Sequence, residues 1–323
     1  MNKPMSVSLT IMLLCGVLFA DEKTPATLRV AALLGPSGIG MSYLFTNTPD
    51  VGQGTVVSFE TAGSVDILLP KMLNREIDIG ILPPNVAAKI YNVNSGSIIA
   101  GAIVGNGMLS LITRDASIKK LSDLAGKTIS VAGQGSTPEY VIRTLLAKSG
   151  IPADSVTLDF SVPTAEIAAA LISNKIDYAL VPEPFATVAV MNGSTGDKPV
   201  IRAILLRDVW NANGLGTDFP MTLCVVRKEY AEKYPATVRK FLEAYKTSIQ
   251  WTNANPAEAG KLVEANNMGL KAPIASKAIP SCNFVFIPAD EGKQSIEKLL
   301  STFLAYAPES IGGKLPDGSF YFK

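Results

Sequence analysis

One pattern occurs twice in this sequence and limits the fold more than any other feature: a buried strand, a turn marked by prolines, and the start of a helix. It reads IDIGILPPNVA at residues 77–87 and IDYALVPEPFA at residues 176–186, so the two copies lie 99 residues apart (176 − 77). A helical segment precedes each copy, SVDILLPKMLNRE in one case and TAEIAAALISNK in the other. Chance resemblance between βα units is the alternative, but helix, strand, turn and helix recur in the same order. We therefore expect two similar α/β lobes.

Short aliphatic runs alternate with helical stretches around both copies. Strands that read as continuous Val, Ile, Leu and Ala are typical of sheets covered by helices on both faces. The segment MLSLITRD (108–115) ends the first series and MTLCVVRK (221–228) follows the second. We predict that the chain leaves lobe I through the first segment and returns through the second, so that they form two crossing hinge strands between the lobes. The predicted fold class is α/β with two lobes, lobe I being residues 27–115 plus 218–323 and lobe II residues 116–217.

The first twenty residues are typical of a secretory signal peptide. Lys3 precedes an apolar run that extends to Ala20 and is too short for a comfortable membrane span. We predict cleavage after Ala20 and a periplasmic or otherwise extracytoplasmic mature protein. Lipid anchoring through Cys15 is a less favoured alternative, because Leu14 stands where that processing needs a small residue.

The composition excludes several classes of function. The 323 residues include no histidine, which rules out Ser-His-Asp and Cys-His nucleophile systems and every histidine-containing metal site. We expect no metal site and no cofactor. The 29 basic and 28 acidic residues nearly balance, without the basic cluster that nucleic acid requires. After cleavage, Cys224 and Cys282 remain; an even count permits one disulfide, and two buried thiols fit at least as well.

Six strand-to-helix junctions, three in each predicted lobe, carry helix-start signals. Ligands of such sheets bind outside the carboxyl ends of the strands, where helix N-termini present unpaired N–H groups. The loop GQGSTPE (133–139) is the most informative, because Gly133 and Gly135 let the backbone approach a ligand. The candidate N-cap residues of the six helices are Ser37, Ser64, Asn85, Ser136 or Thr137, Thr164 and Glu183. Each loop alone has the residues of an ordinary turn. Together, the six loops predict a cleft between the lobes that is lined on both sides by backbone N–H donors.

Three segments carry a family resemblance: KLSDLAGKTISVAGQGSTPEYV, EIAAALISNKIDYALVPEPF and RKEYAEKYPATVRKFLEAY, in that order. In these segments the chain resembles the type II periplasmic binding proteins of ABC transporters, in the NMT1/THI5-like branch that includes nitrate, taurine, alkanesulfonate and thiamine-precursor binders. The resemblance implies a monomeric receptor that closes on a small molecule and delivers it to an ABC permease with its ATPase. It also implies a cleft lined by Gly35, Pro36, Ser37, Gly63, Ser64, Asn85, Gly135, Ser136, Thr137 and Glu183.

The ligand class stays open between a polar heterocycle, a zwitterion and an oxyanion. These loops contain no Arg or Lys, which counts against a simple sulfonate or nitrate. Glu183 stands where the first copy of the repeat has Pro84. Its carboxylate either complements the helix dipole or, if it faces the cleft, accepts a hydrogen bond from a donor on the ligand.

Two other functions compete with a solute-binding role. The first is an enzyme on the same scaffold, like the fungal relatives that make the thiamine pyrimidine with an active-site histidine. The absence of histidine disfavours it. The second is an exported adhesin or structural protein, which predicts no closed ligand pocket.

Overall fold

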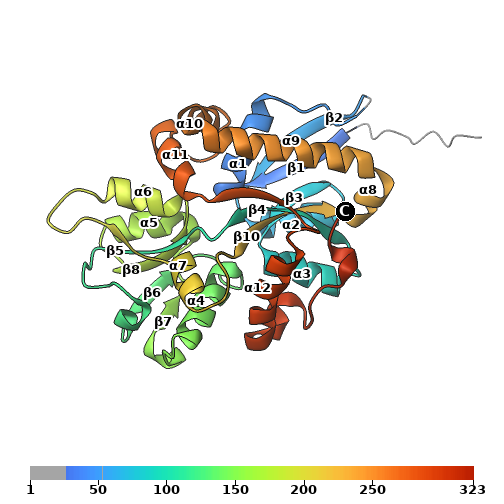
Figure 1. Ribbon diagram of the computed structural model, residues 1–323. Helices are drawn as coiled ribbons and strands as arrows, with labels where there is room; N and C mark the ends of the chain where they lie inside the picture. The colour runs from blue at the N-terminus through green and yellow to red at the C-terminus, as the bar shows by residue number, and fades with distance from the viewer. Residues whose placement is uncertain (1–26, 53) are drawn as a thin grey trace, which may run out of the picture.

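The computed structural model describes residues 27–52 and 54–323, so the predicted signal peptide, its cleavage site and Cys15 lie outside the described residues. Two mixed sheets, each covered by helices, form two lobes (Figure 1). The six-stranded sheet has the order β11-β4-β10-β3-β1-β2 and the five-stranded sheet the order β7-β6-β8-β5-β9. We call them, with their helices, the first and second lobes. The prediction of an α/β fold with two lobes is confirmed.

The first lobe is built from both ends of the described chain. Its strands are β1 (Thr27–Leu33), β2 (Val56–Ala62), β3 (Ile79–Leu82), β4 (Ile98–Asn106), β10 (Pro220–Arg227) and β11 (Phe284–Pro288). Its helices are α1 (Pro36–Thr46), α2 (Val65–Leu73), α3 (Pro84–Val93), α8 (Lys228–Lys233), α9 (Pro235–Ala254), α10 (Pro256–Ala265), α11 (Ala272–Ala278) and α12 (Lys293–Tyr306). Helix α9 lies across the face of this sheet in Figure 1, and its apolar side is buried.

The second lobe comes from one continuous stretch of chain. Its strands are β5 (Leu109–Thr113), β6 (Thr128–Val131), β7 (Thr157–Asp159), β8 (Tyr178–Pro182) and β9 (Ile201–Leu205). Its helices are α4 (Thr137–Lys148), α5 (Thr164–Ile172), α6 (Phe185–Asn192) and α7 (Leu206–Ala212). Short 3₁₀ turns are η1 (Leu121–Leu124) and η2 (Ala153–Ser155) here, and η3 (Ile279–Ser281), η4 (Pro308–Ile311) and η5 (Gly318–Phe320) in the first lobe.

The two copies of the repeat hold equivalent places in different sheets. Strand β3 contains the IGIL of the first copy and β8 contains the YALVP of the second. In the first sheet β1 pairs in parallel with both β2 and β3, and in the second β6 pairs in parallel with both β7 and β8. An antiparallel strand then follows in each sheet, β10 beside β3 and β5 beside β8. The repeat therefore reflects a duplicated architecture.

The prediction of two crossings between the lobes is confirmed, and the two segments pair with strands of different sheets. Strand β5, from MLSLITRD, pairs with β8 and β9, whereas β10, from MTLCVVRK, pairs with β3 and β4. Each supplies the antiparallel strand of a different sheet, and the residues of both are largely buried. The chain crosses between the lobes on the short links before β5 and before β10. The lobe boundary at residue 115 stays a prediction, although the sheet that holds β5 favours a boundary near Gly107.

The two links between the lobes are tied to one another. The Gly107 N–H donates to Oδ1 of Asp218 (2.8 Å), so the outgoing link is bonded to the returning one. The Asn283 amide donates to Oδ2 of Asp218 (2.7 Å) and to the Gly107 carbonyl (3.3 Å). A Cβ at Gly107 would lie 2.5 Å from Asp218 Oδ1 and 3.0 Å from the Phe219 ring. The contact therefore requires glycine.

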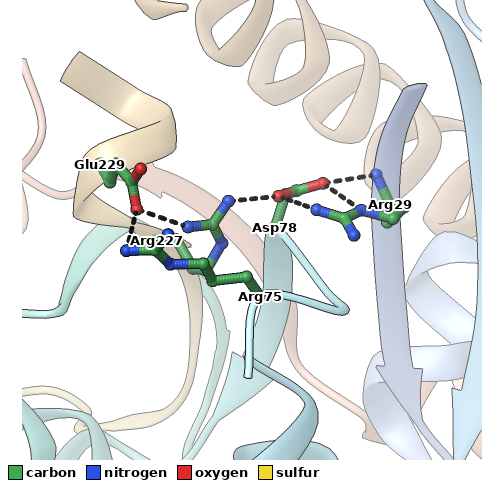
Figure 2. A network of polar contacts seen from close by, with 5 residues as sticks. All are labelled: Arg29, Arg75, Asp78, Arg227 and Glu229. Atoms are coloured by element: carbon green, nitrogen blue, oxygen red, sulfur yellow. Dashed lines mark hydrogen bonds and ion pairs between the residues drawn. The ribbon is translucent and has the colours of Figure 1, made fainter. Parts of the chain in front are cut away.

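A buried carboxylate joins three strands at the edge of the first sheet opposite the predicted loops. Asp78 Oδ2 accepts from Arg29 Nε (2.9 Å), and Oδ1 accepts from Arg29 Nη2 (2.9 Å) and Arg227 Nη2 (2.8 Å). Figure 2 shows Asp78 between the two guanidiniums, with Glu229 linking Arg227 to Arg75. The hydrogen bond to Asp78 raises the pKa of Arg29 above its ordinary value. The network fixes the starts of β1 and β3 to the end of β10.

The two cysteines of the described chain are not joined. Cys224 and Cys282 are free and buried, so the interpretation as buried thiols is confirmed and no disulfide joins them. Burial raises the pKa of both thiols.

The last residues pack on the first sheet: Phe320 and Tyr321 are buried, and the Phe322 N–H donates to the Ala100 carbonyl of β4 (2.9 Å).

Replacing Asp78 with alanine should destabilise the protein by about 3–5 kcal/mol, because it leaves the partly buried Arg227 without its main counter-ion. Glu229→Ala is the matched control; the Glu229 side chain is 60% exposed and its ion pairs should contribute at most about 1 kcal/mol. Urea unfolding measures both. Equal effects of the two substitutions would contradict the assigned role of Asp78.

Gly107→Ala should destabilise the protein by about 1–3 kcal/mol, the usual cost of forcing atoms into a packed site. Gly318→Ala is the control, because a Cβ there would meet no atom within 4 Å. Thermal unfolding of both variants tests the requirement for glycine at the hinge, and a Gly107→Ala melting temperature equal to that of Gly318→Ala would refute it.

Candidate functional site

The predicted loops at Gly35 and Asn85 contact the second lobe, but most of the helices begin at other residues than the predicted caps. Ser64 is the N-cap of α2 as predicted, although its side chain makes no capping hydrogen bond. The other N-cap residues are Gly35, Pro83, Ser136, Pro163 and Pro184, again without a side-chain cap. Prolines at the first helical position place Ser37 and Asn85 one step inside their helices. The N-cap predictions at Ser37, Asn85, Thr164 and Glu183 are therefore wrong, and of the two residues predicted for α4, Ser136 rather than Thr137 is the N-cap.

Asn85 contacts the opposite lobe directly. Its Nδ2 donates to the Gly135 carbonyl (2.9 Å), and the Thr137 hydroxyl donates to its Oδ1 (3.2 Å). Asn85 is 1% exposed and Thr137 is fully buried. Three of the predicted site residues, one from the first lobe and two from the second, are thus brought together in one buried contact.

Gly35 is the second predicted residue that faces the other lobe. Its φ of 107° lies in the region that favours glycine, and a Cβ there would meet the Phe185 ring at 4.0 Å. Phe185 is the first residue of α6 in the second lobe. Pro36 follows Gly35 as the first residue of α1, so it lies at the same strand-to-helix turn.

The remaining loop residues make contacts within their own lobes. The Ser64 carbonyl accepts from the N–H groups of Ile67 and Leu68, and a Cβ at Gly63 would meet the Ile67 side chain. The Ser136 hydroxyl donates to the Gly133 carbonyl (2.8 Å). The Gly135 N–H donates to Glu139 Oε2 (2.8 Å), a carboxylate that sequence reasoning missed. A role of these residues in ligand binding stays a prediction.

Glu183 is buried and fully engaged inside the second lobe. Its Oε2 accepts from the N–H (3.1 Å) and the hydroxyl (2.8 Å) of Thr187, in the first turn of α6. Its Oε1 accepts from Nε (3.0 Å) and Nη2 (2.6 Å) of Arg202 on β9. This geometry supports the role at the helix start and removes the argument that Glu183 demands a donor on the ligand.

Sequence reasoning missed Arg202 because the pair joins the turn before α6 to strand β9 and does not form within a loop. The one available signal was an arginine inside the otherwise aliphatic run VIRAILL. Arg202 also changes the electrostatics of the site: it neutralises Glu183, so the carboxylate no longer disfavours an anionic ligand nearby.

A cavity of about 140 Å³ lies at the hinge side of the junction between the lobes. Its lining includes Gly107, Ser110, Glu183, Arg202, Arg207 and Ser281. Cys282 lies close enough to be influenced by this pair: burial raises the pKa of its thiol, Glu183 adds to the rise and Arg202 opposes it. Larger hollows of about 560 and 380 Å³ flank the Asp78 network, at the opposite edge of the first sheet from the predicted loops.

The structure also bears on membranes and metals. Across residues 27–52 and 54–323, no helix has the length and apolar character needed to cross a membrane. Within the same described part of the chain, no group of three or more Asp, Glu or Cys side chains is placed to hold a metal ion.

Arg202→Ala should destabilise the protein by about 3–5 kcal/mol, because it leaves the Glu183 carboxylate buried without its counter-ion. Arg75→Ala is the control: it removes another arginine–glutamate pair, with Glu229, in which the side chains are 68% and 60% exposed, and should cost no more than about 1 kcal/mol. Urea unfolding compares them. If Arg202→Ala costs as little as the control, the pair does not stabilise the site.

The chain is similar to known proteins both in sequence and in fold. The model of the family described as NMT1/THI5 like matches residues 99–259. A search of the curated proteins gives no match. Many solved structures share the fold. An ABC transporter protein from Parabacteroides distasonis is 24% identical, with 93% of this chain and 99% of that chain covered and a TM-score of 0.77.

Two further solved structures have named ligands. The alkanesulfonate-binding protein SsuA from Xanthomonas axonopodis pv. citri, bound to MOPS, is 16% identical over 92% of this chain and 96% of its own, with a TM-score of 0.67. The periplasmic nitrate-binding protein NrtA from Synechocystis is 15% identical over 88% of this chain and 84% of its own, with a TM-score of 0.66. The chain is thus similar to the NMT1/THI5-like family over residues 99–259, and it has the two-lobed fold of type II periplasmic binding proteins.

Proposed function

We propose that this protein is the solute-binding component of an ABC importer. It works outside the cytoplasm as a monomer, closes its lobes on a small polar molecule and delivers that molecule to a permease with its ATPase. The observation that carries the proposal is the buried contact of Asn85 with Gly135 and Thr137, because it joins the predicted ligand loops of opposite lobes. A receptor that closes on its ligand needs such a junction.

The site residues of the proposal are the predicted loop residues. Gly35, Pro36, Ser37, Gly63 and Ser64 would present one wall of the cleft, and Gly135, Ser136 and the start of α6 the other. The starts of α1, α2 and α4 have no side-chain cap at the N-cap position, whereas the start of α6 already has the Glu183 carboxylate. Uncapped helix N-termini favour a ligand with an anionic or strongly accepting group. An oxyanion or the acidic end of a zwitterion fits this better than a cation.

An enzymatic role is the alternative from a different class. The related synthase activity relies on a histidine, and this chain has none in its 323 residues. The solved relatives with named ligands are transport proteins by their descriptions, which supports binding over catalysis.

The search for the ligand can start from the native protein itself. Mass spectrometry of protein purified from its native source should detect a co-purifying small molecule. Nitrate and MOPS are the first two probes for titration calorimetry, since structural relatives bind a nitrate and a sulfonate. A true ligand at a hundredfold excess over its dissociation constant should add about 2.7 kcal/mol to the free energy of unfolding. A co-purifying compound that is chemically turned over would favour the enzyme instead.

Ser64→Ala should weaken binding of that ligand and cost less than about 1 kcal/mol of stability, because the hydroxyl makes no capping hydrogen bond. Ser155→Ala is a matched control in an exposed turn of the second lobe, where the hydroxyl donates to the Pro152 carbonyl. Calorimetry that gives the same affinity for wild type, Ser64→Ala and Ser155→Ala would remove Ser64 from the proposed site.

A further inference from the structure

We propose that Asn85 is a latch: a positioning residue that holds the two lobes closed through direct protein contacts, rather than a group that binds the ligand. The role of this latch rests on the proposed function, because a latch is useful only in a receptor whose lobes open and close. Its geometry stands by itself. Asn85 belongs to the first lobe, and both of its polar partners, Gly135 and Thr137, belong to the second.

The carboxamide has little capacity left for a ligand. Its oxygen accepts the Thr137 hydroxyl proton, and one of its two amide hydrogens is donated to the Gly135 carbonyl. The side chain is 1% exposed, and Thr137 is fully buried. A ligand atom could reach Asn85 only by displacing one of these partners, which would leave a buried polar group unpaired.

The contact can exist only while the lobes are together. Opening the lobes separates α3 from the start of α4 and exchanges both hydrogen bonds for bonds to water. The net stabilisation of each bond is modest, but both lie in a water-excluded site, where breaking only one leaves its partner unsatisfied. The pair of bonds should therefore form and break together, which is the behaviour of a latch.

The two copies of the repeat meet the opposite lobe in different ways. In the first copy Asn85 follows the double proline and makes a polar contact with the start of α4. In the second copy the corresponding turn ends in Phe185, whose ring faces Gly35 at the start of α1. A third contact, between the rings of Tyr140 on α4 and Phe303 on α12, has its centroids 5.4 Å apart. Of these three junctions, only the one at Asn85 consists of hydrogen bonds, which require a defined orientation of donor and acceptor.

A latch that needs no ligand atoms biases the receptor toward closure before a ligand arrives. The apparent dissociation constant equals the intrinsic constant divided by the fraction of protein that is competent to bind. Removing the latch should therefore weaken binding by about tenfold, through a smaller closed fraction and without any lost ligand contact. It should also change the shape of the protein in the absence of ligand.

The test compares Asn85→Ala with Asn92→Ala, both on helix α3. The Asn92 amide donates to the carbonyls of Ile311 and Lys314, inside the first lobe, so it controls for the loss of an asparagine that bonds to backbone. Small-angle scattering of the mature, ligand-free protein is the primary measurement. We expect a larger radius of gyration for Asn85→Ala and no change for Asn92→Ala. Thr137→Val, which removes the hydroxyl donor and keeps the side-chain shape, should give a smaller expansion and covers the case that Asn85→Ala does not fold.

Titration with the ligand or with MOPS separates the outcomes. A latch predicts expansion without ligand and a roughly tenfold loss of affinity, with the radius of the saturated protein restored. An unchanged ligand-free radius together with lower affinity would make Asn85 a ligand contact and overturn the latch. An unchanged radius in both Asn85→Ala and Thr137→Val overturns it regardless of affinity. If the expansion is seen while no small molecule binds, the latch stands and the proposed function fails.

Discussion

The structure depends on one topological constraint: each sheet is completed by an antiparallel strand that lies next to a link between the lobes. Strand β5 enters the second sheet directly after the outgoing link, and β10 enters the first sheet directly after the returning one. The second sheet gains β5 only after the first crossing, and the first sheet gains β10 only after the second. The two links therefore run close together, and the hydrogen bond between Gly107 and Asp218 ties them. This arrangement keeps the carboxyl ends of both parallel strand sets facing the same junction.

The sequence predicted the parts of this arrangement that have a local cause. The repeat identified two equivalent units because strand, proline turn and helix follow one another directly in the chain, and β3 and β8 indeed occupy matching positions. Glycine and proline marked the loops at the lobe junction for the same reason. Asn85 and Gly135 were selected as neighbours of a ligand and prove to be neighbours of each other.

What could not be predicted was set by tertiary pairing. Strands β5 and β10 are both almost continuously apolar, so composition does not show which partner each will choose. The caps moved by one or two residues because the prolines at Pro36 and Pro84 fix the first helical position. The role of Glu183 was undecidable from the loop alone, because Arg202 lies on a strand 19 residues away and reaches it only in the fold. An arginine within an aliphatic strand is a signal that a buried acidic partner exists elsewhere in the chain.

The unequal assembly of the two lobes has a consequence for the order in which they fold as the chain is made. All five strands of the second sheet have emerged once Leu205 is available, so this lobe can acquire its complete hydrogen-bonding pattern while the C-terminal part of the first lobe is still missing. The first sheet must wait for β10 and β11, and its cover is complete only when Phe320 and Tyr321 pack beside β4. The edges of β3 and β4 stay unpaired during that interval. The N-terminal segments of this chain are therefore the last to become protected.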